Sequence, residues 1–199
     1  MNSLFDRLKS AFEEGHARDI PDLLSDEHFA QRQPTPAAVL IAVTDVDAEP
    51  KVILTKRPTT LRDHPGQVAF PGGKLDEGED AVTAALREAW EELALPPEQV
   101  RVIGATDLFH TGTGFAITPV LGVVPPGLDL VPNPMEVEAW FEVPLALLLD
   151  RGNWTANEVF WRGAQRRYLE MDFEGFRIWG VTAAIIANLS RRIDLATID

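Results

Sequence analysis

The sequence contains no cysteine among its 199 residues. Disulfide bonds, thiolate metal sites and cysteine nucleophiles are therefore excluded. Basic residues are also scarce, because 18 Lys and Arg stand against 31 Asp and Glu and give a formal net charge of −13. Nucleic acids and anionic membranes bind broad basic surfaces, so we expect neither as a partner.

Long apolar runs are missing as well. No segment approaches the roughly 18 apolar residues that a membrane span needs. The first residues lack the apolar core of a secretory leader, and Asp6, Glu13 and Glu14 argue against an organelle transit peptide. We therefore expect a cytoplasmic protein. A chain of this length with 45% apolar residues is sufficient for one domain with a sizeable core.

Apolar spacing predicts strands mixed with helices. Leu4, Phe5, Leu8 and Phe12 predict a helix over 3–14, which serves either packing or contact in a homodimer. Further strands are predicted at 38–44, 52–55, 100–109, 116–124 and 140–143, a hairpin at 158–162 and 166–172, and helices from Pro144 and over 181–191. This mixture predicts an α/β/α sandwich on a mixed sheet. We expect a helical extension over 1–34 and a catalytic domain over 35–199.

An acidic helix follows a glycine turn in the first half of the chain. On a helical wheel, an apolar stripe lies within about 60° of Val82 and includes Ala85, Leu86, Ala89 and Leu93. Glu88, Glu91 and Glu92 leave the opposite side together. Their mutual repulsion costs roughly 0.2–0.5 kcal/mol per pair, which a hard divalent cation would offset. A solvated acidic face is the alternative for these three acids taken alone.

The residues before this helix favour a metal–diphosphate site. Pro71-Gly72-Gly73 permits a close backbone approach, so that a carbonyl near Gly72 points at a metal ion. Glu79 and Arg87 are eight residues apart, and we expect them to form an orienting ion pair if Glu79 folds back from the loop.

The whole segment resembles the Nudix box. The matching residues are Gly73, Glu79, Arg87-Glu88-Ala89, Glu91-Glu92 and Ala94-Leu95. The departure is Ala94, where the family pattern has glycine, and we expect a slight shift of the helix end there. The resemblance implies the Nudix α/β/α sandwich and a pyrophosphohydrolase that uses Mg²⁺ or Mn²⁺. It also implies metal ligands at Glu88, Glu91, Glu92 and Gly72.

A second motif precedes the box. Leu54-Thr55-Lys56-Arg57-Pro58, Leu61-Arg62, Gly66 and Phe70-Pro71-Gly72-Gly73 are similar to the signature of coenzyme A pyrophosphatases, with Pro58 in place of a small residue. Residues 51–74 carry five Lys and Arg against one Asp, a local charge of +4 (5 − 1) in an acidic chain. We expect Arg57 and Arg62 to bind substrate phosphates, with Gly72 and Gly73 beside them. His64 either contacts a phosphate or caps a turn.

Water attack on phosphorus also needs a general base. Glu91, Glu92 and Glu136 are the candidates, and for Glu136 simple solvation is the alternative. The resemblance implies hydrolysis of coenzyme A or a coenzyme A thioester to adenosine 3′,5′-bisphosphate and 4′-phosphopantetheine or its acyl form. Two alternatives are hydrolysis of another nucleoside diphosphate derivative, such as ADP-ribose or NADH, and a catalytically idle binding module.

Overall fold

The computed structural model describes residues 3–26, 33–46, 49–60, 64–161 and 163–194. Its main sheet contains β1 (Thr35–Thr44), β2 (Lys51–Lys56), β3 (Val68–Ala69), β4 (Gly72–Lys74), β5 (Arg101–Ala105), β6 (Phe109–His110), β7 (Phe115–Val124) and β8 (Ala139–Pro144). The central order is β3-β2-β1-β7-β5, while β4 pairs with β1, β6 with β7 and β8 with β2. Only the β1–β7 pair is parallel among these described strands, so the sheet is mixed as predicted.

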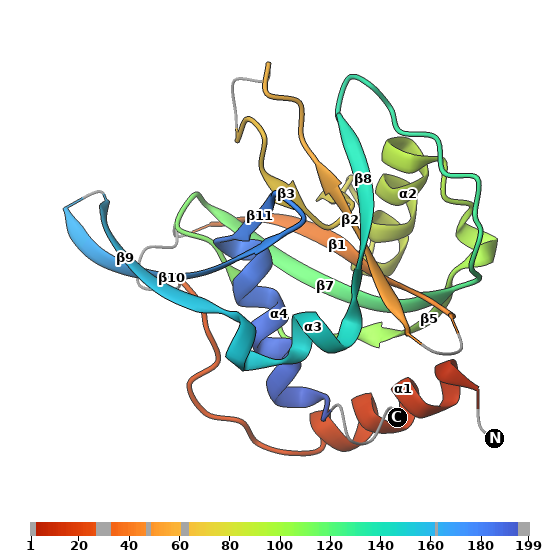
Figure 1. Ribbon diagram of the computed structural model, residues 1–199, viewed down its shortest axis with the longest axis horizontal. Coiled ribbons are helices and arrows are strands. Elements are labelled where there is room, and N and C mark those ends of the chain that lie inside the picture. The colour runs from red at the N-terminus through yellow and green to blue at the C-terminus, as the bar shows by residue number, and fades with distance from the viewer. Residues whose placement is uncertain (1–2, 27–32, 47–48, 61–63, 162, 195–199) are drawn as a thin grey trace.

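Helices cover both faces of this sheet (Figure 1). They are α1 (Leu4–His16), α2 (Ala81–Leu93), α3 (Leu145–Leu149) and α4 (Val181–Arg192). In β1, Ile41 and Val43 join the core beneath α1, α3 and α4, whereas Leu40 and Ala42 join the core beneath α2. This alternation follows from the two-residue period of a strand, and it confirms the predicted sandwich.

The N-terminal helix uses its apolar face inside the chain. Ser3 accepts a hydrogen bond from the Asp6 amide and closes a capping box at its start. Leu4, Leu8 and Phe12 are buried in the core. Packing is thus the role that the structure accounts for, and the division of the chain at residue 34 stays a prediction.

One predicted strand is interrupted. Residues 100–109 were expected to be continuous, but β5 and β6 are separate and both pair with β7. The chain leaves the sheet between them, where Asp107 turns toward Arg192 on α4 and accepts two hydrogen bonds at 2.9 and 2.7 Å. The expectation of one strand was wrong because apolar alternation does not register such a tertiary ion pair.

A second, three-stranded sheet extends from the body of the molecule (Figure 1). It consists of β9 (Thr155–Trp161), β10 (Ala164–Phe173) and β11 (Phe176–Trp179), which pair in sequence as antiparallel neighbours. The hairpin predicted around Gly163 is confirmed. Two short 3₁₀ turns, Pro97–Gln99 and Arg151–Asn153, complete the described elements.

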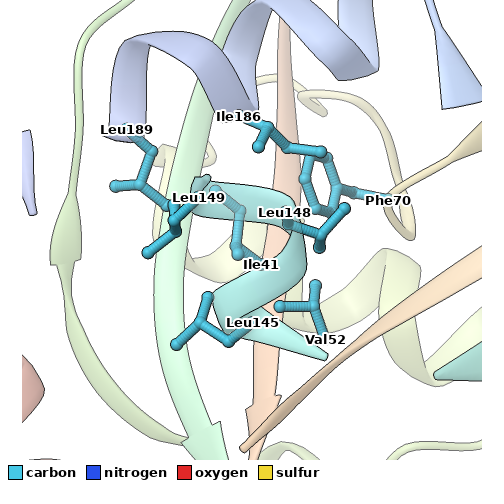
Figure 2. Close-up of a pocket in the computed structure, with 8 residues that line it drawn as sticks. All are labelled: Ile41, Val52, Phe70, Leu145, Leu148, Leu149, Ile186 and Leu189. Atoms are coloured by element: carbon cyan, nitrogen blue, oxygen red, sulfur yellow. The ribbon is translucent and has the colours of Figure 1, made fainter. Parts of the chain in front are cut away.

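The core beneath α3 and α4 is closely packed. Figure 2 shows side chains from β1, β2, α3 and α4 converging on a cavity of about 10 Å³. An apolar cavity of this size is at the lower limit for a single water molecule. It is therefore a small packing defect and not a ligand site. Among the described residues, no helix is long and apolar enough to cross a membrane.

Candidate active site

Helix α2 carries the acidic residues and has well-defined ends. The Asp80 side chain accepts a hydrogen bond from the Thr83 amide at 2.8 Å and caps the start. Ala94 ends the helix in the left-handed conformation, with a φ of 53°, and its amide donates to Ala89 and Trp90 carbonyls. Alanine thus takes the backbone conformation that glycine adopts more easily, and the helix ends here with local strain.

The glycine turn brings a strand against this helix. Gly72 and Gly73 lie in β4 and pair with Val39 and Ala38 of β1. A Cβ atom on Gly72 would lie 2.4 Å from the Ala38 carbonyl oxygen, and one on Gly73 would lie 2.3 Å from Oε1 of Glu88. Only glycine permits both approaches, so these two residues set the distance between the backbone and the helix carboxylates.

The expected ion pair between Glu79 and Arg87 is present. Nε and Nη2 of Arg87 donate to the two oxygens of Glu79 at 3.0 and 2.9 Å, and Nη2 also donates to the Lys74 carbonyl at 3.0 Å. The hydrogen bond from Arg87, together with one from the Asp76 amide, holds the pKa of Glu79 below its usual value. Arg87 thereby ties the loop before α2 to the helix.

Arg87 also reaches the helix acids. Its Nη1 atom donates to Glu88 at 2.9 Å and to Glu91 at 3.2 Å. A single guanidinium therefore balances part of the charge of two carboxylates that stand on the same side of the helix.

The three acids predicted to leave the helix on one side differ in burial. The Glu91 side chain is 50% exposed, whereas the Glu88 side chain is 12% exposed and Glu92 as a whole is 4% exposed. Helical spacing gives the side from which an acid leaves the helix, and it does not show whether another segment covers that acid. Glu92 is covered by β4 and by the loop that contains Asn133.

Glu92 is the least satisfied of these acids. Its Oε2 atom is buried and has no hydrogen-bond partner within the described residues. Burial, followed by the negative charges of Glu88 and Glu136, raises the pKa of Glu92 to about 8, although a backbone hydrogen bond from Gly72 and the charge of Arg57 act in the opposite direction. Burial also raises the pKa of Glu88, with the charges of Glu91 and Glu136 adding to it.

A loop that connects β7 to β8 brings Glu136 to the same place. The Asn133 amide donates to the carbonyl of Glu92 at 2.8 Å, and the Val131 amide donates to the carbonyl of Leu93 at 2.8 Å. Val137 is buried beneath α2 and anchors the loop. Glu136 thus joins the acidic cluster electrostatically, although 44 residues (136 − 92) separate it from Glu92.

The basic loop, residues 57–67, follows β2 in the sequence and carries Arg57 and Arg62. It begins beside this cluster. Nε of Arg57 is buried and has no hydrogen-bond partner in the described part of the chain, and its charge acts on Glu92. Arg62, the other predicted phosphate ligand, lies outside the described residues. Lys56, the cation that precedes this loop, is already paired with Glu138 at 2.6 Å. Arg57 is therefore the described cation of this loop that is best placed for an anion.

Glu138 has contacts that lie far from it in the sequence, so no local pattern predicts its role. Its carboxylate binds Lys56 and accepts a hydrogen bond from the Thr59 amide at 3.1 Å, almost eighty residues earlier. The spacing of Glu136 and Glu138 gave no signal for this division, because residues two apart in an extended segment point to the same side. The turn over residues 133–137 separates their surroundings, so that Glu138 binds Lys56 while Glu136 lies near the acids of α2.

Comparisons with known proteins show the family of this chain. Residues 34–162 match the family model described as NUDIX domain. The chain belongs to the Nudix family. It is 44% identical over 171 residues to a Cronobacter sakazakii protein called uncharacterized Nudix hydrolase NudL, covering 85% of this chain and 87% of that one. A Klebsiella pneumoniae protein of the same name is 40% identical over 186 residues, which cover 89% and 96% of the two chains.

The fold also resembles a solved Nudix structure. The M. smegmatis Nudix hydrolase RenU is 26% identical, with a TM-score of 0.51 over 60% of this chain and 76% of that chain. Nudix enzymes are pyrophosphohydrolases that act on nucleotide derivatives and typically depend on divalent metal ions. This general activity, hydrolysis of a pyrophosphate bond, applies to the present Nudix protein.

Proposed function

We propose that this Nudix protein hydrolyses the pyrophosphate bond of coenzyme A or a coenzyme A thioester. The products are adenosine 3′,5′-bisphosphate and 4′-phosphopantetheine or its acyl form. The motif at residues 54–73 supports coenzyme A as the substrate. One observation supports a diphosphate at this place: the buried, unpartnered Nε of Arg57 lies in the electrostatic range of a carboxylate cluster whose Glu92 oxygen is also unpartnered among the described residues. A substrate diphosphate would supply an anion for Arg57, and the divalent cation bound to that diphosphate would be a partner for Glu92.

The donor set fits a magnesium or manganese ion. Among the described residues, no three His, Asp or Glu side chains converge into a preformed metal site, and Arg87 lies between Glu88 and Glu91. Even so, the orphaned Glu92 oxygen and its raised pKa indicate a carboxylate that lacks a cation. Glu88, Glu91 and Glu92, with the Gly72 carbonyl, would hold the ion. When bound, it neutralises diphosphate charge and acidifies a nearby water molecule.

The protein's own residues position the reaction. Arg57, and Arg62 by its place in the motif, hold substrate phosphates through paired N–H donors. Gly72 and Gly73 let the backbone of β4 lie close to β1 and to Glu88, and the diphosphate would bind beside them. Arg87 and Glu79 fix the loop against α2. Arg87 and Glu79 therefore contribute to the reaction by positioning the carboxylates of α2.

A carboxylate then accepts a proton from the attacking water. Glu136 is our choice, with Glu91 and Glu92 as alternatives, because Glu136 borders the cluster without belonging to α2. The water oxygen forms a new bond to one phosphorus atom, and the bond from that atom to the bridging oxygen breaks. The bridging oxygen leaves on the other phosphate, so the two products together contain one added water.

Product analysis tests the proposal. Purified protein is incubated with Mg²⁺ and equal concentrations of coenzyme A, 3′-dephospho-coenzyme A, ADP-ribose and NADH, and the products are resolved by mass. Preferred conversion of coenzyme A to phosphopantetheine and adenosine 3′,5′-bisphosphate is the expected result. Preference for another substrate would keep the Nudix activity and reject the coenzyme A assignment. No cleavage of any of them, with Mn²⁺ also tried, would favour a binding module.

A further inference from the structure

Glu138 makes three contacts at the base of the basic loop. Its carboxylate accepts a hydrogen bond from Lys56 Nζ at 2.6 Å and another from the Thr59 amide at 3.1 Å. Its own backbone amide donates to the Lys56 carbonyl at 2.8 Å. These contacts surround Arg57 in the sequence, so the backbone on both sides of that arginine is held by one glutamate.

The same loop segment is also held to α2. Asn133 and Val131 donate backbone hydrogen bonds to the last carbonyls of the helix, and Glu136 reaches the carboxylates of Glu88 and Glu92 electrostatically. Residues 131–138 therefore contact the acidic cluster at one end and the basic loop at the other. The segment 68–74 makes a second connection, since Val68 pairs with Lys56 while the Gly72 backbone bonds to Glu92.

The far side of the basic loop has its own closure. The Arg57 amide donates to the Gln67 carbonyl at 2.9 Å, and the Gln67 amide donates to the His64 carbonyl at 3.2 Å. His64 and Gly66 have positive φ values of 53° and 69°, so this turn is tightly bent. The hydrogen bond from Arg57 to Gln67 thus holds the end of the loop, and Glu138 holds its start.

We propose that Glu138 is a positioning residue that holds Arg57 and the start of the basic loop against the acidic cluster, and so sets the affinity for the diphosphate substrate. This role rests on the proposed function, because it assumes that the loop binds phosphate. Glu138 itself contacts neither the substrate nor the reacting atoms. Lys56 is its neutralised partner and not a phosphate ligand.

The sign of the effect separates this role from simple electrostatics. Removing a negative charge beside an anion site by itself favours anion binding. If Lys56 were a phosphate ligand held back by Glu138, loss of Glu138 would free Lys56 and lower the KM. Positioning requires the opposite result, a higher KM, because Arg57 is released from its alignment.

Two substitutions grade the contacts. Glu138→Ala removes both side-chain contacts and should raise the KM by about tenfold, while kcat changes by less than about threefold. Glu138→Gln keeps an oxygen for the Thr59 amide and should raise the KM by only about threefold. Glu142→Gln is the matched control, since Glu142 lies four residues further on in β8 and has no ion pair within the described residues, and its KM should equal that of the wild type.

A binding measurement removes turnover from the comparison. Calorimetric titration with coenzyme A in the presence of EDTA should show the same ranking of dissociation constants, and melting temperatures should show that each variant is folded. An unchanged or lower KM in both Glu138 variants would overturn the proposal. So would a fall in kcat at constant KM, or an equal effect of Glu142→Gln. If Glu138→Ala does not fold, Glu138→Gln alone decides.

The two proposals fail separately. The variants are compared on whichever of the four diphosphates the wild-type protein cleaves fastest. A wild type that prefers ADP-ribose would reject the coenzyme A assignment, yet the ratio of KM values would still test Glu138.

Discussion

Two buried ionisable groups in this protein have opposite surroundings. Arg192 on α4 is 8% exposed, and it donates to both oxygens of Asp107 and to the carbonyls of Gly15 and Arg18 at 3.0 and 2.6 Å. Glu92 on α2 is 4% exposed, and one of its oxygens has no partner among the described residues. Each nitrogen of the first group has at least one partner in the chain itself. The second is left for something that the chain does not supply.

This difference separates a structural charge from a functional one. A buried charge with all its hydrogen bonds made stabilises one arrangement of the elements around it, here α1, α4 and the β5–β6 connection. A buried charge without them costs free energy in the free protein. That cost is retained where binding of a ligand offsets it, which is the condition of an active site.

The largest expected effect is the loss of turnover when Glu92, whose Oε2 atom has no partner among the described residues, is substituted. Glu92→Gln keeps the shape of the side chain but removes a cation-binding carboxylate, so kcat/KM should fall by about a thousandfold or more. Glu91→Gln should also lower turnover by orders of magnitude despite the 50% exposure of Glu91. Steady-state kinetics with a common substrate measure both, and normal turnover in both variants would refute the assignment of the site.

The same substitution should stabilise the metal-free fold. The pKa of Glu92 is raised from 4.5 to about 8 in the folded state, so unfolding is favoured by ionisation of Glu92 as the pH rises from about 4.5 to about 8. Its unfavourable contribution is absent below pH 4.5 and complete above pH 8. Thermal unfolding in EDTA should therefore show a higher Tm for Glu92→Gln than for the wild type at pH 9, by several degrees, and equal values near pH 4. A lower Tm at pH 9 would show that Glu92 is satisfied after all.

At the satisfied charge the effect should have the opposite direction. Burial alone raises the pKa of Asp107, but the hydrogen bonds and the charge of Arg192 outweigh it and hold the pKa below the usual 3.8. Asp107→Asn should lower the free energy of unfolding by about 2–3 kcal/mol at pH 7. The difference from the wild type should shrink as the pH falls below about 4, where Asp107 becomes protonated. Denaturant titration at pH 7 and pH 3 measures this, with kcat unchanged as the control.

The smallest effect concerns the end of the helix that carries the acids. Ala94 has a φ of 53°, which is strained for alanine and ordinary for glycine. Ala94→Gly should raise the free energy of unfolding by about 0.5–1 kcal/mol, the relief of strain being partly offset by the greater freedom of glycine in the unfolded chain. Turnover should stay within about twofold. A loss of stability in urea titration would mean that the alanine methyl group makes a packing contribution that exceeds its backbone strain.

Particular residues show which parts of the fold could be predicted. The helix over 3–14, the strand over 38–44 and the hairpin around Gly163 followed from local apolar spacing, and all three are present. The strand over 100–109 was predicted as one element and is two, because Asp107 leaves the sheet to bind Arg192. Local patterns report which residues are apolar, but they do not report a partner 85 residues away.

The site divides in the same way. An ion pair between Glu79 and Arg87 was expected if Glu79 folds back from the loop, and their paired hydrogen bonds are present. Helical geometry alone could not show that Glu92 is buried, since the covering strand and loop come from residues 72–73 and 131–138. The role of Glu138 was equally hidden, because its partners Lys56 and Thr59 are brought to it only by the pairing of β2 with β8.

The sequence by itself determined the class of fold, the Nudix family and the spacing of the acids, because periodicity and motif spacing are properties of the chain. Only the tertiary structure decided which carboxylate oxygen and which guanidinium nitrogen of the described residues are buried without a partner, and which glutamate binds Lys56 and Thr59. The physical reason is that burial and hydrogen bonding depend on segments distant in sequence. Pairing of β1 with β4 and of β2 with β8 brings those segments together.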